Sequence, residues 1–254
     1  MKTSPATRAL ALDALRGFAV LWMTGFHFAF DLNYFGFIHQ DFYNVTLWTV
    51  QRTCILGLFL LCAGAGQALA LARGQSPRDF WRRWGQITAC AVLVSLGSRA
   101  MFPTSWIYFG VLHGMAVMLV VCRFTAHWGR WLWLAGALAV VLGQVAPQLH
   151  ALWPQMSLFN APALNWLGLV DQKPITEDYV PVLPWLGVMW WGVAAGQWAL
   201  ARGWLQAGGH RPARRWSVGA TLAWVGRWSL SWYMVHQPLL IGLLILARSV
   251  GAGR

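Results

Sequence analysis

The chain has 254 residues, of which 58% are hydrophobic and only 10% are charged. A soluble domain normally carries about 25% charged residues, so the composition predicts an integral membrane protein. The net charge of +12 would suit nucleic acid. However, the basic residues lie between apolar segments, where they orient a protein in a bilayer. We therefore expect a lipid bilayer, and no nucleic acid, among the partners of the chain.

The apolar segments predict an all-α fold, a polytopic membrane helix bundle with about seven transmembrane helices. One span needs about 20 predominantly apolar residues, and the chain is long enough for one compact bundle. We expect spans at about residues 11–31, 47–72, 80–101, 105–123, 129–147, 182–202 and 228–249. Residues 1–254 are expected to form a single membrane-embedded domain.

The basic residues also predict the orientation. If the amino terminus is cytoplasmic, fourteen of the nineteen Lys and Arg residues fall on the inner side, as the positive-inside rule requires. Two basic clusters lie there, at residues 78–83 and 211–215. Such clusters suit anionic lipid, and they also suit the phosphates of a cytosolic nucleotide-like ligand.

The first expected span carries four polar side chains: Asp13, Arg16, His27 and Asp31. At helical spacing they fall within an arc of about 60° on one face. Charges inside membrane helices are costly and usually face the protein interior or a wet cavity, so this seam is a candidate functional site. A structural alternative is an ion pair of Asp13 with Arg16, plus a buried His27 that Asp31 orients from one turn away.

Two later spans carry further histidines. His113 lies in the fourth span, and His236 lies in the seventh, which Arg227 begins at its cytoplasmic end. Tyr233, His236 and Gln237 share one face of that span. Histidine accepts protons near neutral pH, which suits proton transfer or acyl transfer. Buried polar contacts between helices would use the same residues.

Several other kinds of site lack support. The chain has no Gly-x-Ser-x-Gly, Walker loop, His-Glu-x-x-His or Gly-x-Gly-x-x-Gly motif. Its four cysteines have no Cys-x-x-Cys spacing, so we expect no metal site. The long outer connection, residues 148–181, is expected to be functional or mobile. Its last part contains Asp178 and Tyr179, which could line an outward-facing mouth.

Three motifs together resemble a known family. They are Arg8-x4-Asp13-x2-Arg16-Gly17 with Met23-x3-His27-x3-Asp31-Leu32, then Tyr108-Phe109-Gly110-Val111-Leu112-His113, and Gly226-Arg227-x-Ser229-Leu230-x2-Tyr233-x2-His236-Gln237-Pro238. In this order they resemble the heparan-alpha-glucosaminide N-acetyltransferase catalytic-domain family. The matched residues run from 8 to 238.

The resemblance implies a membrane acyltransferase that takes an acetyl group from cytosolic acetyl-CoA, its co-substrate, and passes it to an amino sugar on the far side. Carried over, it makes His27 the general base or acyl-transfer histidine, with Asp31 orienting it. Arg16 would meet the acyl donor near the cytosolic face, together with Asp13 and Arg227 as cofactor-binding residues. Two further candidates for the catalytic set are His113 and His236.

The resemblance also implies a multi-pass protein of the bacterial inner (cytoplasmic) membrane. The acceptor would be an amino sugar or an envelope glycan, and a homodimer is compatible with these expectations. One alternative function is a proton-coupled transporter or exporter of a small envelope precursor, which would give proton-dependent flux without a covalent product. A membrane scaffold is a second alternative, in which the polar motifs only guide helix packing.

Overall fold

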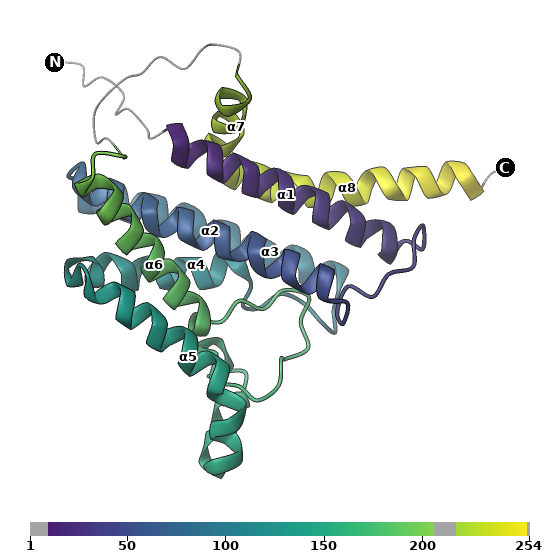
Figure 1. The fold of residues 1–254 in the computed structure, drawn as a ribbon. Helices are drawn as coiled ribbons and strands as arrows, with labels where there is room; N and C mark the ends of the chain where they lie inside the picture. The colour runs from purple at the N-terminus through teal and green to yellow at the C-terminus, as the bar shows by residue number, and fades with distance from the viewer. Residues whose placement is uncertain (1–9, 206–216, 253–254) are drawn as a thin grey trace. The chain divides into compact units, whose positions relative to one another are not determined.

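The computed structural model describes residues 10–205 and 217–252. Within these residues the chain is helical and contains no strand (Figure 1), which confirms the all-α prediction. The α-helices are α1 (Leu10–Tyr34), α2 (Thr46–Ala72), α3 (Pro77–Met101), α4 (Val111–Thr125), α5 (Trp131–Leu152), α6 (Val182–Ala201), α7 (Val218–Arg227) and α8 (Ser229–Ala252). The short 3-10 helices are η1 (Ala126–Trp128), η2 (Pro154–Asn160) and η3 (Asn165–Leu167).

Four of the described helices are long and apolar enough to cross a membrane: α2, α4 continued by η1, α5 and α8. Of the other predicted spans, α1 and α3 carry charged residues, and α6 is rich in tryptophan and glycine. A helix forms at each of the seven expected places. The number of spans, seven, stays a prediction.

Three helix boundaries differ from expectation, one of them at the end of α5, which runs on to Leu152 although the fifth span was expected to end near residue 147. The fourth predicted span began at residue 105, whereas α4 begins at Val111, because residues 102–110 hydrogen-bond to α3 and to the long connection instead. Near the carboxyl end, Arg227 was expected to open the last span. It lies instead in the last turn of α7, a separate ten-residue helix that Ser217 caps. The last long helix, α8, begins two residues later, at Ser229.

The described chain divides into two compact units. Unit 1 contains α1, α7, α8 and the part of α2 up to Phe59. Unit 2 contains the rest of α2, from Leu60, together with α3, α4, α5 and α6. The single domain expected from the sequence stays a prediction.

In unit 1, α1 lies alongside α7 and α8 (Figure 1). Buried apolar side chains of α1, Met23 and Phe26, pack with Phe42 of the following loop and Ile55 of α2. The α1–α8 contact also has a hydrogen bond, in which the Trp232 indole donates to the hydroxyl of Thr24 at 2.9 Å. Tyr233 of α8 also packs against this cluster, so an apolar contact and a hydrogen bond together hold α8 against α1.

Two motif glycines explain how closely α1 approaches α7. A Cβ atom on Gly17 would lie 1.9 Å from the carbonyl oxygen of Leu222, and one on Gly226 would lie 1.8 Å from that of Asp13. The two backbones therefore touch, and any side chain at either position would push the helices apart. This contact brings the Arg16-Gly17 and Gly226-Arg227 motifs together.

In unit 2, glycines likewise allow close contact between helix backbones, here between α2 and α6. A Cβ atom on Gly64 of α2 would lie 2.2 Å from the carbonyl oxygen of Met189, and one on Gly192 of α6 would lie 2.4 Å from that of Leu61. Small residues allow helix backbones to approach in this way in membrane proteins. The neighbouring helices α5 and α6 run side by side (Figure 1), and the Trp191 indole joins them by a bond to a carbonyl of α5.

The long connection, residues 153–181, also belongs to unit 2. Its end pairs with the segment before α4, through a bond from the Val180 amide to the Phe109 carbonyl at 3.1 Å. Asp178, which the sequence placed as a possible lining residue of an outward-facing mouth, accepts a hydrogen bond from the Val111 amide at 2.7 Å. This carboxylate therefore caps the start of α4, where unpaired amides favour a negative charge.

Candidate functional site

His27 of α1 and His236 of α8 meet in unit 1. Nδ1 of His27 lies 2.7 Å from Nε2 of His236. The ring centres are 5.0 Å apart and the ring planes are only 12° from parallel. The distance between the ring centres equals the N–N distance plus the distance from the centre to the nitrogen in each ring. Both nitrogens therefore lie on the line between the ring centres, so the rings lie edge to edge and are not stacked face to face. The two imidazoles therefore share an in-plane hydrogen bond.

Backbone carbonyls determine which nitrogens carry protons when both rings are neutral. Nδ1 of His236 lies 2.8 Å from the carbonyl oxygen of Tyr233 and 3.1 Å from that of Trp232. Since these oxygens only accept, we assign the proton of His236 to Nδ1, which makes its Nε2 the acceptor. His27 must then donate through Nδ1. Its Nε2 is then unprotonated and keeps a free lone pair, with no hydrogen-bond partner among the described residues.

One helical turn beyond His27, Asp31 contacts the residue that follows His236. Gln237 donates from Nε2 to Oδ1 of Asp31 at 2.7 Å, although Asp31 is only 3% exposed. The other carboxylate oxygen, Oδ2, and the amide oxygen of Gln237 are buried and have no hydrogen-bond partner among the described residues. Buried polar atoms are normally paired, so these two acceptors are suited to a donor group of a ligand.

The observed partners differ from the expected ones. The sequence suggested that Asp31 orients the ring of His27, but the hydrogen bond of Asp31 goes to Gln237 and that of His27 goes to His236. Gln237 was noted only as a neighbour on the same helix face. Residue spacing shows which side chains share a face of α8, but not which face of α1 they meet. The partners could not be chosen without the α1–α8 contact.

The residues expected to bind the acyl donor lie at the other end of α1. Asp13 is buried and accepts a bond from Arg16 at 3.3 Å. Arg227 is exposed at the end of α7, next to Gly226 in the α1–α7 contact. This end of unit 1 therefore gathers two arginines and one acid. The predicted basic cluster at 211–215, like Arg8, lies outside the described residues.

His113 belongs to unit 2 and not to the histidine pair. It lies in the first turn of α4, where its Nδ1 accepts from the Gly110 amide at 3.3 Å and its Nε2 lies 3.0 Å from the hydroxyl of Ser95. That hydroxyl in turn donates to the Ile107 carbonyl at 2.7 Å. Both ring nitrogens are thus used: Nε2 joins α4 to α3, and Nδ1 accepts from the N-cap of α4 itself. This arrangement matches the structural role that the sequence left open.

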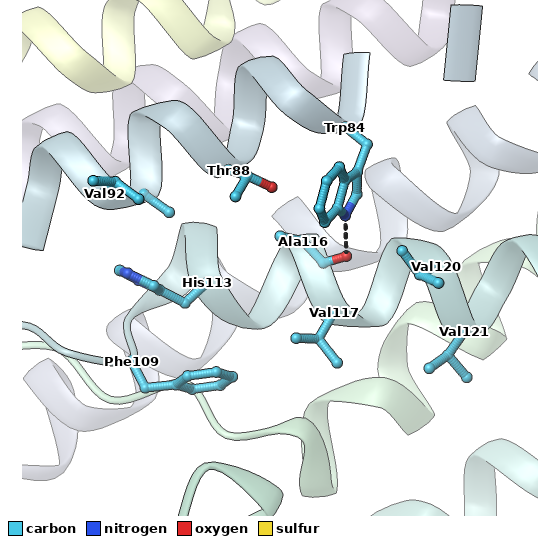
Figure 2. Close-up of a pocket in the computed structure, with 10 residues that line it drawn as sticks. Trp84, Thr88, Val92, Phe109, His113, Ala116, Val117, Val120 and Val121 are labelled. Atoms are coloured by element: carbon cyan, nitrogen blue, oxygen red, sulfur yellow. Dashed lines mark hydrogen bonds between the residues drawn. The ribbon is translucent and has the colours of Figure 1, made fainter. Parts of the chain in front are cut away.

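A cavity of about 410 Å³ lies between α3 and α4. Figure 2 shows His113 among the residues that line it. The cavity is lined by Trp84, Thr88, Ala91, Val92, Phe109, His113, Ala116, Val117, Val120 and Val121. The Trp84 indole is already bonded to the Ala116 carbonyl at 3.0 Å. Among the buried polar side-chain atoms that line the cavity, the hydroxyl of Thr88 is the one without a hydrogen-bond partner in the described chain. The walls suit an apolar group, and His113 is the one titratable side chain among the lining residues.

Comparison with known proteins supports the family resemblance. The sequence matches the family described as "Heparan-alpha-glucosaminide N-acetyltransferase, catalytic" over residues 8–238. No curated protein and no solved structure matches the chain. The match includes both ends of the polar seam on α1, the α1–α7 glycines and the histidine pair. The chain therefore belongs to the heparan-alpha-glucosaminide N-acetyltransferase catalytic family, a family of membrane acetyltransferases.

Proposed function

We propose that this protein transfers an acetyl group from cytosolic acetyl-CoA to the amine of an amino sugar or envelope glycan on the outer side of the membrane. The observation that carries the proposal is the 2.7 Å contact between Nδ1 of His27 and Nε2 of His236. From this contact we assign the tautomer of His27 in which Nε2 keeps a free lone pair. A general base needs such a nitrogen. Family membership supports the reaction class, and the pair supplies the base.

The proposed reaction is direct transfer. The acceptor nitrogen attacks the thioester carbonyl, and His27 Nε2 takes the proton that this nitrogen loses. A carbon–nitrogen bond forms, the carbon–sulfur bond breaks, and the leaving thiolate takes a proton back to give free CoA. No covalent acyl-histidine is required.

Asp31 and Gln237 are proposed to hold the acceptor. Their unpartnered oxygens, Asp31 Oδ2 and Gln237 Oε1, both accept hydrogen bonds. A neutral primary amine has two N–H groups, so it can give one to His27 and still donate the other to one of these oxygens, whereas a hydroxyl has only the proton that His27 takes. A buried acceptor that stays unpaired costs about 1–3 kcal/mol, so the pair favours an amine over a hydroxyl. We therefore favour N-acetylation over O-acetylation.

The acyl donor is proposed to bind with its nucleotide end near Arg16, Asp13 and Arg227. Arginine suits phosphate because its planar group forms two parallel hydrogen bonds. His27 lies eleven positions after Arg16, about 16 Å along the helix. The flexible arm of CoA can bridge such a distance, so α1 would hold phosphates at one end and the thioester at the other. This requires a cytoplasmic amino terminus in a bacterial inner membrane.

The test uses purified protein in detergent, first by thermal shift and then by transfer. Acetyl-CoA should raise the melting temperature more than free CoA or ATP, since a ligand that binds only the folded state stabilises it. Arg16→Ala should remove this shift. Radioactive acetyl groups should then appear on glucosamine in proteoliposomes. A folded protein that binds no CoA species but carries protons would favour the transporter alternative.

A further inference from the structure

We propose that His236 is the positioning residue of the acyl-transfer site: it fixes the tautomer of His27 and receives its proton during the reaction. The inference rests on the proposed function for its chemistry. Its geometry stands independently, on the 2.7 Å bond between the two rings and on the carbonyl oxygens of Trp232 and Tyr233.

The first role follows from the anchoring of His236 to its own helix. Its Nδ1 proton faces two carbonyl oxygens, so the ring cannot present Nδ1 as an acceptor. Its Nε2 must accept, and His27 must donate from Nδ1. Without His236, the proton of His27 could move to Nε2, and the general base would lose its lone pair. The wrong tautomer of a catalytic histidine is inactive even when its position is unchanged.

The second role is to hold charge. When His27 Nε2 takes the proton of the acceptor amine, His27 becomes an imidazolium whose Nδ1 proton already points at His236 Nε2. That proton can cross the 2.7 Å bond, which leaves His27 neutral and His236 positive. The two carbonyl oxygens then face the cation directly. When the thiolate leaves, His27 gives up its Nε2 proton and the Nδ1 proton returns from His236. Protons and charges balance over the cycle.

The surroundings of the pair fit this exchange. His236 is only 6% exposed, so bulk water does not compete for its proton. Phe26 lies beside His27 and Tyr233 lies beside His236, with ring centres 6.0 and 5.9 Å away. The carboxylate of Asp31 lies one turn along α1, on the same face, and its negative charge favours a cation on the pair. Each of these groups comes from unit 1.

The tautomer can be tested without measuring activity. The full chain, labelled with ¹⁵N-histidine in lipid nanodiscs, is studied by solid-state NMR. We expect one N–H···N coupling between two histidines, with protons on Nδ1 of both rings and a bare Nε2 on His27. Loss of this signal in His236→Gln assigns it. A spectrum in which His27 carries its proton on Nε2, or in which no histidine pair is coupled, overturns the proposal.

Kinetics separate positioning from packing. His236→Leu removes the acceptor and should lower kcat about 10³-fold. His236→Gln places an amide oxygen near the former Nε2, which accepts from His27 but takes no proton, so kcat should fall only about tenfold with KM unchanged. His39→Gln, in an exposed loop, is the matched control and should keep full activity. A folded His236→Leu protein with unchanged kcat contradicts the proposal.

The two measurements also distinguish the proposals. If the wild-type protein transfers no acetyl group but NMR shows the predicted tautomers, the proposed function is wrong and the pair is a proton-holding site of another kind. If transfer occurs and the tautomers are absent, the function stands and the role of His236 is wrong. Melting temperatures of both variants exclude loss of fold as the cause.

Discussion

Replacing Gly17 by alanine tests the contact between α1 and α7 most sharply. The new Cβ would lie 1.9 Å from the Leu222 carbonyl oxygen, and ordinary contact begins at 3.4 Å, so the helices would have to move apart by about 1.5 Å. The atom in the way belongs to the backbone and cannot rotate aside. Overpacking of this kind costs about 1–3 kcal/mol, and we expect the upper end of that range.

Part of this cost is offset, because alanine stabilises a helix by about 1 kcal/mol relative to glycine. The net expectation for Gly17→Ala is a loss of about 2 kcal/mol. A chain of this size loses about 2–4 °C per kcal/mol, so the melting temperature should fall by about 4–8 °C. Gly25→Ala is the matched control on the same helix. Its Cβ meets nothing within 4 Å, so the melting temperature should rise by about 2–4 °C.

The assay is thermal unfolding of detergent-purified protein, followed by circular dichroism. The double variant Gly17→Ala with Gly226→Ala gives a further check, because both new side chains enter the same contact. Once the helices have separated for one, the second costs less, so the two losses should add to less than their sum. If Gly17→Ala and Gly25→Ala change the melting temperature in the same direction, the close contact is wrong.

The remaining predictions concern the segments around α4. Asp178→Ala removes the carboxylate that accepts from the Val111 amide, so thermal unfolding at neutral pH should show a loss of about 1 kcal/mol, and Asp178→Asn should keep most of it. Burial raises the pKa of both Tyr108 and Tyr179, whose hydroxyls bond to Asn165. Because the pKa of each phenol is higher in the folded than in the unfolded state, the protonated phenol stabilises the fold. This contribution is complete below the ordinary tyrosine pKa of about 10 and is lost as the pH rises from there through the raised pKa. Melting temperatures measured from pH 8 to 11 should therefore fall at the alkaline end. The fall should be less steep in Tyr179→Phe than in the wild type. Equal slopes of melting temperature against pH in the two proteins would contradict the burial of this hydroxyl.

Residue spacing predicted the polar seam well. Asp13, Arg16, His27 and Asp31 all lie on the single helix α1, and the Asp13–Arg16 pair forms as expected. The Asp13–Arg16 pair belongs to the structural alternative, and the acyl-donor role of these two residues stays a prediction. Their shared helix face could be predicted because the 3.6-residue period fixes which side chains share a face within one helix. Apolar segments likewise gave the positions of the long helices within a few residues. These are local properties, which one chain segment determines by itself.

The features that the sequence did not predict, namely the start of α4, the separate helix α7 and the histidine pair, depend on tertiary contacts. The start of α4 depends on a hydrogen bond from the Ile107 amide to the hydroxyl of Ser98. It also depends on pairing with the long connection, whose residues are far away in the sequence. The separate helix α7 depends on its capping serine and on its contact with Gly17. The bond between His27 and His236 joins residues 209 positions apart. No periodicity in either helix indicates which face of the other it meets.

The most direct test of the proposed function is acetyl transfer by the His27→Ala variant. Wild-type and variant protein are reconstituted in liposomes, and transfer of radioactive acetyl from acetyl-CoA to glucosamine is measured, with melting temperatures to show that both proteins are folded. Removal of the general base should lower turnover by about 10²–10⁴-fold and leave the thermal shift by acetyl-CoA intact. A folded His27→Ala protein with near-normal turnover would contradict the central claim, and the search for the base would then move to His113.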